Sequence, residues 1–404
     1  MPVRTLKNEA LQSLGALTFV CERTGLPKII ASQWLSINES KYSKSYIGQN
    51  LYALNLLYEH FSKHPDLEDL DQTFISQDFS AINRGLRSFV SERQNISAIR
   101  GVEQSTTVQM ACSILISVIE EFNVRTSNFG RNAQELQRSV SSIQVLHKFL
   151  RPPKKYRKKK IRSLPYTVIE EIFSLVHPES KRNPFRNEKI RHRNFVIVSI
   201  LYLMGIRQGE LLLLSTNSIK TEFDPESLQR FYWMDIHNSG LFDTRISEPS
   251  LKTNFSVRQI PVPDQLYAII RNFSENYRGK AKHGFLFSSQ KGGPLSSRAL
   301  NEIFEKLSTK LSDSASEKLL ERCKTKKITP HNFRHSAAVD RIRAYRHSSV
   351  PMDQAESLLR EFFGWSPNSN MPRLYAKAFY EEQLNSFWHS KFDDRVSRML
   401  NCEK

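Results

Sequence analysis

The residue best suited to chemistry in this sequence is an arginine beside an expected helix start. Arg207 follows an apolar run that ends at Gly205, and Glu210 stands three residues further on, before four leucines. An arginine at a helix N-terminus suits a phosphate group, because its guanidinium adds donors to the free backbone N–H groups there. Taken alone, the pattern is more often a surface ion pair between Arg207 and Glu210, so its meaning depends on other motifs.

Two further motifs carry basic residues that suit the same chemistry. His331 and Arg334 are three residues apart in Pro-His-Asn-Phe-Arg-His, so a helix that begins at the proline presents both on one face. Lys252 opens the segment Lys-Thr-Asn-Phe-Ser-Val-Arg-Gln-Ile-Pro-Val-Pro, next to expected strands. A neutral histidine beside a guanidinium could act as a base next to an anion clamp. The ordinary alternatives are a packed histidine in a capped helix and a solvated lysine.

A fourth motif, near the end of the chain, is aromatic. Trp365 closes Phe-Phe-Gly-Trp, Tyr375 follows ten residues later, and Tyr380 is a second tyrosine close by. A lone tyrosine usually fills a core or a surface. The significance of Tyr375 therefore comes from its position after the other three motifs.

Taken in this order, the four motifs resemble the tyrosine recombinase family, of the phage-integrase type. The resemblance covers roughly residues 165–385, and the ordered set is far more specific than any single motif. It implies a mainly α fold with a small antiparallel β-sheet: a helical N-terminal core-binding domain, then a mixed α/β catalytic domain. It also implies a role for each residue of the motifs. Arg207 and Arg334 would clamp the phosphate, Lys252 would be the hairpin lysine and His331 the first histidine. Trp365 would take the place of a second histidine, Tyr375 would be the nucleophile, and Glu210 and His335 would be supporting residues.

The sequence departs from the family pattern in places. Trp365 keeps an N–H donor but is not titratable. The stretches 307–327 and 335–365 are long, and 366–373 contains prolines where the family commonly has serine and threonine, which bears on local loop geometry. Tyr380 is the rival nucleophile, and its spacing from Trp365 is less suitable than that of Tyr375.

The resemblance implies a specific reaction, namely cutting and rejoining of DNA through a 3′-phosphotyrosyl link. Two fixed guanidiniums would stabilise the charge that develops on the phosphate, His331 would accept or orient the tyrosine proton, and Lys252 would protonate the departing 5′ oxygen. The covalent link conserves the energy of the broken bond, so we expect neither a cofactor nor a metal ion. The leading hypothesis is a site-specific recombinase, an integrase or transposase of a mobile element. Alternatives are a type IB topoisomerase-like or telomere-resolving enzyme and a catalytically inactive DNA-binding relative.

The charge distribution agrees with a nucleic-acid partner. The 404 residues carry a net charge of +18, of which residues 1–150 contribute +1, residues 151–162 contribute +8 and residues 163–404 contribute +9. This excess favours a polyanionic partner. We expect the central run to lie along duplex DNA, the alternative being a solvated charge run. Its basic residues are Arg151, Lys154, Lys155, Arg157, Lys158, Lys159, Lys160 and Arg162.

Composition and patterning predict the domain organisation. We expect a helical DNA core-binding domain over 1–150, in which 1–38 could form an extension, a linker over 151–164, and a catalytic domain over 165–404 with a tail helix at about 383–400. Apolar spacing predicts helices around 11–20, 51–61, 110–122, 136–146 and 167–176, and a helix–turn–helix over 192–215. Short strands are expected at 231–234, 243–247 and 256–262.

The remaining expectations concern surroundings and partners. The four cysteines lack metal-site spacing, which favours a reducing cytosol, and the apolar run 195–206 is shorter than the ~20 residues of a membrane helix. No signal-peptide pattern precedes the first helix. We therefore expect a cytoplasmic, nucleoid-associated bacterial protein without a membrane partner. It should form a homotetramer on synapsed DNA, remain a monomer or weak oligomer when free, and work with accessory DNA-bending or directionality proteins.

Overall fold

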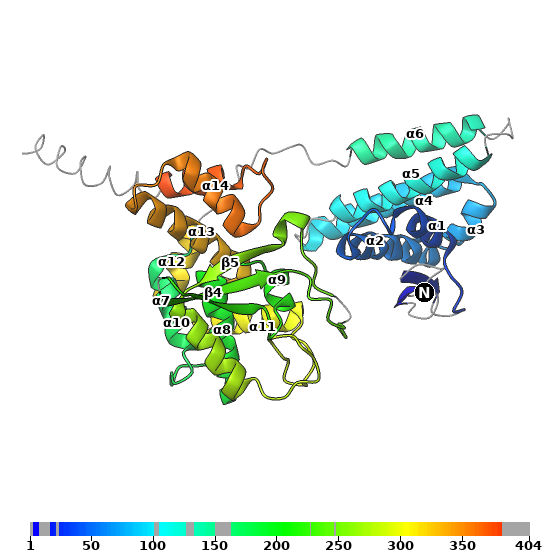
Figure 1. The fold of residues 1–404 in the computed structure, drawn as a ribbon. Helices are drawn as coiled ribbons and strands as arrows, with labels where there is room; N and C mark the ends of the chain where they lie inside the picture. Colours follow the sequence, from blue (N-terminus) through cyan, green and yellow to red (C-terminus); the bar gives the residue numbers. More distant parts are fainter. Residues whose placement is uncertain are drawn as a thin grey trace, which may run out of the picture. The chain divides into compact units, whose positions relative to one another are not determined.

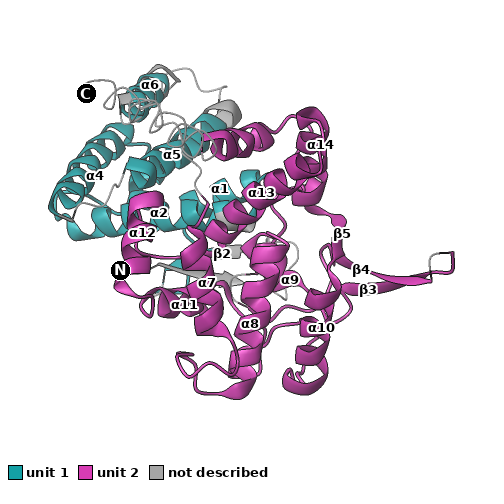
Figure 2. Cartoon of the chain, turned by 90° about the vertical axis from the view of Figure 1, so that its left-hand side faces the viewer, with its two compact units in different colours: residues 1–157 teal, residues 158–404 magenta. Residues whose placement is uncertain are grey.

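The computed structural model describes residues 3–7, 17–21, 24–100, 105–126, 133–149, 163–226, 228–245 and 248–381. The chain divides into two compact units, Met1–Arg157 and Lys158–Lys404, each built around its own apolar core (Figure 2). This division falls within the basic run 151–162, which lies outside the described residues. The expected tail helix at 383–400 lies outside them too.

The first unit is mainly helical, as predicted (Figure 1). Its core is formed by apolar faces such as Leu54 and Leu57 on one helix and Ile114 and Ile119 on another, all fully buried. The expected helices at 51–61, 110–122 and 136–146 are confirmed. The elements of this unit are β1 (Val3–Lys7), β2 (Leu17–Cys21), α1 (Ile29–Asn38), α2 (Lys44–Lys63), α3 (Leu70–Ile75), α4 (Phe79–Arg100), α5 (Ser105–Thr126) and α6 (Ala133–Phe149).

The helix expected around 11–20 is wrong over its second half. Residues Leu17–Cys21 form strand β2, which pairs antiparallel with β1. The segment Leu-Thr-Phe-Val-Cys is rich in β-branched and aromatic residues, which fit a pleated surface better than a helix. Phe19 is 2% exposed and joins the helical core, so tertiary packing overrides the apparent helical spacing. Residues 8–16 lie outside the described part.

The second unit is a mixed fold in which helices surround a three-stranded antiparallel sheet of order β3-β4-β5. In the register, Met234 pairs with Ile219 and with Ile260, and Met234 and Ile260 are buried in the core. Its elements are α7 (Tyr166–Val176), α8 (Glu188–Leu203), α9 (Gln208–Leu213), β3 (Ile219–Asp224), β4 (Gln229–Ile236), η2 (Asn254–Ser256), β5 (Arg258–Val262), α10 (Asp264–Asn272), η3 (Phe273–Tyr277), α11 (Ser297–Ser308), α12 (Asp313–Cys323), α13 (Pro330–His347) and α14 (Met352–Phe363).

Three local predictions for the second unit need correction. Residues 243–245 are not a strand, because Arg245 is buried and donates to the carbonyls of Leu212 and Leu295, which anchors the segment as a loop. Strand β3 was not predicted, since its residues are mostly exposed and show no apolar alternation. The last strand begins at Arg258, after the short helix η2, and so starts later than the expected 256.

Two tight turns, each at a glycine, allow several helices of the second unit to pack closely. Gly205, after α8, has φ +57°, and a Cβ there would lie 2.6 Å from the ring of Phe363 and 2.8 Å from the Cβ of Ala337. Gly364, after α14, has φ +59°, and a Cβ there would lie 2.8 Å from the carbonyl oxygen of Phe255. Only glycine tolerates this conformation and this crowding. These turns therefore let α8, α13, α14 and η2 approach one another closely.

No helix in the described part of the chain is both long and apolar enough to cross a membrane.

Candidate active site

A buried carboxylate organises the basic residues of the second unit. Glu210 is 1% exposed, and its oxygens lie 2.6 Å from Nη1 of Arg207, 3.0 Å from Nη2 of Arg258 and 4.0 Å from Nη1 of Arg334. Burial opposes its ionisation, but Arg258, Arg334 and the backbone N–H of Arg207 outweigh burial and hold the pKa of Glu210 below its ordinary 4.5. The cluster of Glu210 with Arg207, Arg258 and Arg334 therefore keeps two uncompensated positive charges, which suit binding of an anion.

Arg334 is held rigidly at the centre of the site. Its Nη1 donates to the carbonyl of Gly205 and its Nη2 to the carbonyl of Phe363, each at 2.7 Å. Its guanidinium also lies over the rings of Phe363 and Trp365, 4.8 and 5.6 Å from their centroids. Burial, reinforced by the charge of Arg207, lowers its pKa to about 9, so the group stays charged at neutral pH. The sequence spacing predicted this helix-start position, and the structure confirms it.

Arg207 is the more accessible of the two predicted clamp arginines. It precedes α9, its backbone N–H donates to Glu210, and Nη1 also donates to Oγ of Ser256 at 3.2 Å. Its side chain is 21% exposed, against 3% for Arg334. The predicted pairing with Glu210 is thus confirmed, but it belongs to a buried network and is not a simple surface ion pair. The exposed edge of Arg207 is where an anion would arrive.

Tyr375 lies against this network in a fully covered position. It stands in a helical stretch over 371–381, its side chain is 0% exposed, and its ring stacks on Trp365 with centroids 5.3 Å apart. Its hydroxyl lies 2.8 Å from Nδ1 of His335. Burial raises the pKa of Tyr375 to about 12, although Arg334 and Arg207 act in the opposite direction. The phenol is therefore protonated at neutral pH and must lose its proton to act as a nucleophile. Tyr380, the rival, is 43% exposed.

The histidine in contact with the tyrosine is His335, which the sequence indicated only as a supporting residue. Burial, with His331 and Arg334 nearby, lowers the pKa of His335 to about 4, so its ring is neutral and can accept a proton. His331, predicted to be the base, is exposed, and its ring centroid lies 4.2 Å from that of His335. The role of His331 in proton transfer stays a prediction, and the structure adds His335 as the direct neighbour of the hydroxyl.

The depressed pKa of His335 predicts a loss of stability in mild acid. The unfolded ring takes up a proton near pH 6.5 while the folded ring resists until about pH 4, so stability is fullest above 6.5 and falls below it. Between pH 7 and 5 this one group would cost about 2 kcal/mol of unfolding free energy. We expect His335→Gln to flatten the decline measured by chemical denaturation, whereas His347→Gln, at an exposed position on the same helix, should not. Equal slopes for His335→Gln and the wild type would contradict this.

Lys252 makes no bonded contact with the other predicted site residues that the structure describes. It lies between β4 and β5, it is exposed, and it has no bonded partner among the described residues. Its segment is nevertheless tied to the site, because Oγ1 of Thr253 lies 3.3 Å from Oγ of Ser256, which contacts Arg207. The role of Lys252 as a proton donor remains a prediction. The eight basic residues of 151–162 lie outside the described part.

Sequence reasoning missed Arg258 as a member of the site. Its side chain is 7% exposed, and it donates to Glu210, to the carbonyl of Phe362 at 2.7 Å and to the carbonyl of Ser256 at 2.7 Å. A signal was available, because Arg258 alternates with Ile260 and Val262, and alternate residues of a strand share one face. An arginine in phase with two inward apolar residues predicts a buried guanidinium that needs an acid.

The fold and the site together define a mixed helical domain in which a carboxylate holds three guanidiniums beside a buried tyrosine–histidine pair. Residues 164–382, more than half of the chain, match the phage integrase family. The chain therefore belongs to that family, and the predicted membership of the tyrosine recombinases is confirmed.

Individual similar proteins are named as recombinases. The chain is 25% identical over 234 residues to the tyrosine recombinase XerD of Chlorobaculum tepidum, a match that covers 54% of this chain and spans 66% of that protein. Among solved structures, it is similar to the XerA recombinase, with 13% identity and a TM-score of 0.36 over 88% of this chain and 97% of the other. It is also similar to the XerH recombinase bound to its difH substrate before cleavage, with 14% identity and a TM-score of 0.42 over 93% and 94%.

Proposed function

We propose that this chain is a site-specific DNA recombinase, an integrase or transposase of a mobile element, with Tyr375 as its nucleophile. The observation that carries the proposal is the 2.8 Å contact between the Tyr375 hydroxyl and the neutral ring of His335, next to two fixed guanidiniums. A phenol in contact with a neutral imidazole has a group beside it that can take its proton when it attacks a phosphodiester. The arginines supply the charge that binds such a phosphodiester.

The proposed reaction conserves bonds and protons. The Tyr375 oxygen bonds to phosphorus as the bond between phosphorus and the 5′ oxygen breaks, which leaves a 3′-phosphotyrosyl link. The phenol proton passes to a histidine, His335 or His331, and the 5′ oxygen takes a proton from Lys252. Arg207 and Arg334 stabilise the charge on the non-bridging oxygens. Attack by a 5′ hydroxyl of another strand reverses the step and joins the new partners.

Tyr375 has to leave its covered position for this reaction. A fully buried ring that stacks on Trp365 cannot reach a phosphate outside the protein. DNA binding would supply the free energy for this release, since phosphate contacts with a basic protein are strongly favourable. The active state is therefore a DNA-bound conformation, in which the hydroxyl reaches the scissile phosphate and one of the two histidines, His335 or His331, stays close enough to take its proton.

A suicide substrate tests the proposed function. The preferred DNA site would first be selected from random duplexes, and a nick would then be placed so that the short cleaved fragment diffuses away. We expect a covalent adduct that survives denaturation. Tight binding to the selected site without any adduct would support the inactive DNA-binding alternative. Relaxation of supercoiled plasmid that lacks the site would support the topoisomerase-like alternative.

The basic run 151–162 gives a prediction about salt. If its eight cations contact phosphates, neutralising them should flatten the plot of log affinity against log salt by about one unit for each lost contact. The variant would replace all eight Lys and Arg residues with glutamine, and binding would be measured by fluorescence anisotropy from low to moderate salt. The control is a variant that loses the same number of positive charges from exposed lysines elsewhere, including Lys220 and Lys310. An unchanged slope would mean that the run is a solvated charge segment.

The proposed assembly gives a prediction about the C-terminal segment. We expect a homotetramer on synapsed DNA in which the tail, residues 383–404, docks on a neighbouring subunit, with docking on its own domain as the alternative. Deletion of 383–404 should then abolish tetramers while the affinity for one half-site stays unchanged. Analytical ultracentrifugation with half-site and full-site duplexes measures both. Normal tetramers of the truncated chain would refute docking in trans.

A further inference from the structure

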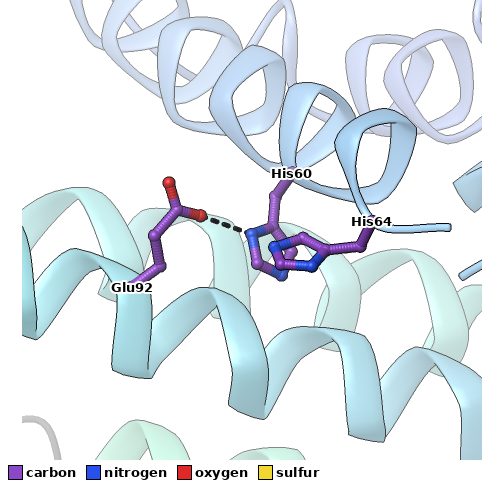
Figure 3. A group of neighbouring side chains, drawn as sticks. All are labelled: His60, His64 and Glu92. Carbon is purple, nitrogen blue, oxygen red and sulfur yellow. Dashed lines mark hydrogen bonds and ion pairs between the residues drawn. The ribbon is translucent and has the colours of Figure 1, made fainter. Parts of the chain in front are cut away.

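Two histidines and a glutamate converge in the first unit, away in sequence from every residue assigned to the reaction. His60 lies near the end of α2, His64 caps the same helix, and Glu92 lies on α4 (Figure 3). Each residue offers one ligand atom, and these atoms all lie within 4.8 Å of one another. Because Glu92 is far from the histidines along the chain, sequence spacing alone does not bring the three residues together.

His60 is the fixed member of the cluster. Its side chain is 0% exposed, and its ring packs against Phe61 and Phe89 with centroids 6.3 and 5.6 Å away. Its Nδ1 contacts the Glu92 carboxylate, while Nε2 is buried without a hydrogen-bond partner in the described part of the chain. The aromatic packing therefore fixes the ring so that Nδ1 is the nitrogen presented to Glu92 (Figure 3).

His64 and Glu92 are the adjustable members. His64 follows His60 by four residues, so both lie on one face of the helix, and their ring centroids are 4.2 Å apart. His64 is exposed and the Glu92 side chain is 38% exposed, so both can move, and an ion could enter from solvent. The other Glu92 oxygen lies 3.5 Å from Arg93, so a metal ion would compete with this arginine for the carboxylate.

We propose that His60, His64 and Glu92 bind a divalent transition-metal ion of the Zn²⁺ class. Two imidazoles and a carboxylate are a donor set that Zn²⁺ prefers, with bonds of about 2.0–2.2 Å, and water can complete a tetrahedron. Ligands of one such ion lie roughly 3.3 Å apart at those bond lengths, so His64 turns inward and Glu92 draws slightly back from His60. The ion takes the place of the contact between His60 and Glu92 and links the end of α2 to α4.

This metal site is separate from the proposed chemistry. The expectation that strand cutting needs no metal ion concerns residues of the second unit, whereas the cluster belongs entirely to the first. Because a bound ion adds contacts that exist only in the folded state, it would stabilise the helical unit by an amount that grows with the logarithm of its concentration. Its role is therefore structural.

The experiment uses the full chain, expressed without a polyhistidine tag and stripped with a chelator. Zn²⁺ titration is followed by calorimetry, and Co²⁺ titration by its visible absorption, which reports coordination geometry directly. We expect one ion per chain, an upward shift of the unfolding temperature with Zn²⁺, and at least tenfold weaker binding in His64→Ala. His64 is exposed, so this variant should unfold as the wild type does without metal. His347→Ala, an exposed histidine on α13, is the matched control and should bind normally.

Each outcome decides the proposal. One ion per chain that is lost in His64→Ala and kept in His347→Ala supports it, and weakened binding in Glu92→Gln assigns the carboxylate as a ligand. Equal binding to wild type and His64→Ala would overturn it, because the ion would then be elsewhere. Absence of binding to the wild type would also overturn it and leave His60 and Glu92 as a hydrogen-bonded pair between two helices.

Discussion

Replacing Tyr375 with phenylalanine should eliminate covalent attachment to a nicked suicide substrate while leaving DNA binding intact. The substitution removes only the hydroxyl, and the ring that stacks on Trp365 is kept, so the fold should be preserved. Without that oxygen no phosphotyrosyl bond can form, and the adduct should fall to the background of the assay. Gel analysis under denaturing conditions measures the adduct, and a mobility shift under native conditions measures binding.

Tyr380→Phe is the matched control for this experiment. Tyr380 is five residues further along the same helical stretch and 43% exposed, and it has no contact with the arginine network among the described residues. It should form adduct at the wild-type rate. An adduct that persists in Tyr375→Phe and disappears in Tyr380→Phe would reverse the assignment. Loss of DNA binding in Tyr375→Phe would instead point to a structural role for the hydroxyl and His335.

Glu210→Gln should strongly destabilise the second unit. The substitution keeps the size of the side chain but leaves Arg207, Arg258 and Arg334 without their carboxylate, and Arg258 and Arg334 are almost fully buried. Removing one partner of a buried ion pair costs about 3–5 kcal/mol, because an uncompensated charge remains inside. We expect that loss in the unfolding free energy of the second unit, and a loss of adduct formation as the arginines lose their orientation.

The comparison for Glu210 is a glutamate with an equally short ion pair at the surface. Glu305 lies 2.6 Å from Lys327, but both side chains are more than half exposed. Glu305→Gln should therefore leave the denaturation midpoint unchanged, since exposed ion pairs are screened by water and salt. If the two variants were equally stable, the buried network would not contribute to stability. Because the chain has two units, each transition must be followed with its own probe.

The lowered pKa of Glu210 also sets the direction of its pH dependence. A carboxyl whose folded-state pKa lies below its ordinary 4.5 stabilises the fold above that pH, and its contribution disappears as the pH falls further. Wild type should therefore lose stability below about pH 4.5 more steeply than Glu210→Gln. The effect of His335 lies at higher pH, between about 6.5 and 4, so the two contributions can be separated by titration.

Local sequence patterns predicted much of the site because its helix starts are locally encoded. Arg207 and Glu210 are three residues apart, and a capping arrangement at α9 needs only that spacing. The start of α13 is encoded in the same way, since Thr329 caps it together with Asn332 and proline follows directly. Such elements depend on few neighbours, so their positions follow from composition and spacing.

Contacts between distant segments could not be predicted in the same way. Arg258 and Phe362 are 104 residues apart, and His335 and Tyr375 are 40 apart, so only the folded chain shows which of two histidines meets the tyrosine. Strand β2 was missed for a related reason, because its pairing with β1 and its packing on the helical core outweigh the local spacing of apolar residues around 11–20. In each case tertiary contacts decide between local alternatives of similar energy.

The covered position of Tyr375 has a consequence for accidental damage to a genome. Breaking one aromatic stack and one hydrogen bond costs about 1–3 kcal/mol, which reduces the exposed population of the nucleophile by roughly five- to 150-fold. If the proposed function holds, a chain that collides with arbitrary DNA would present its arginines but not its phenol, and it would dissociate without nicking. Only a duplex that engages the protein long enough and widely enough to draw the ring out would be cut. Discrimination between the correct DNA and other DNA would then depend on a conformational change of the protein, which precedes any change of bonds in the DNA.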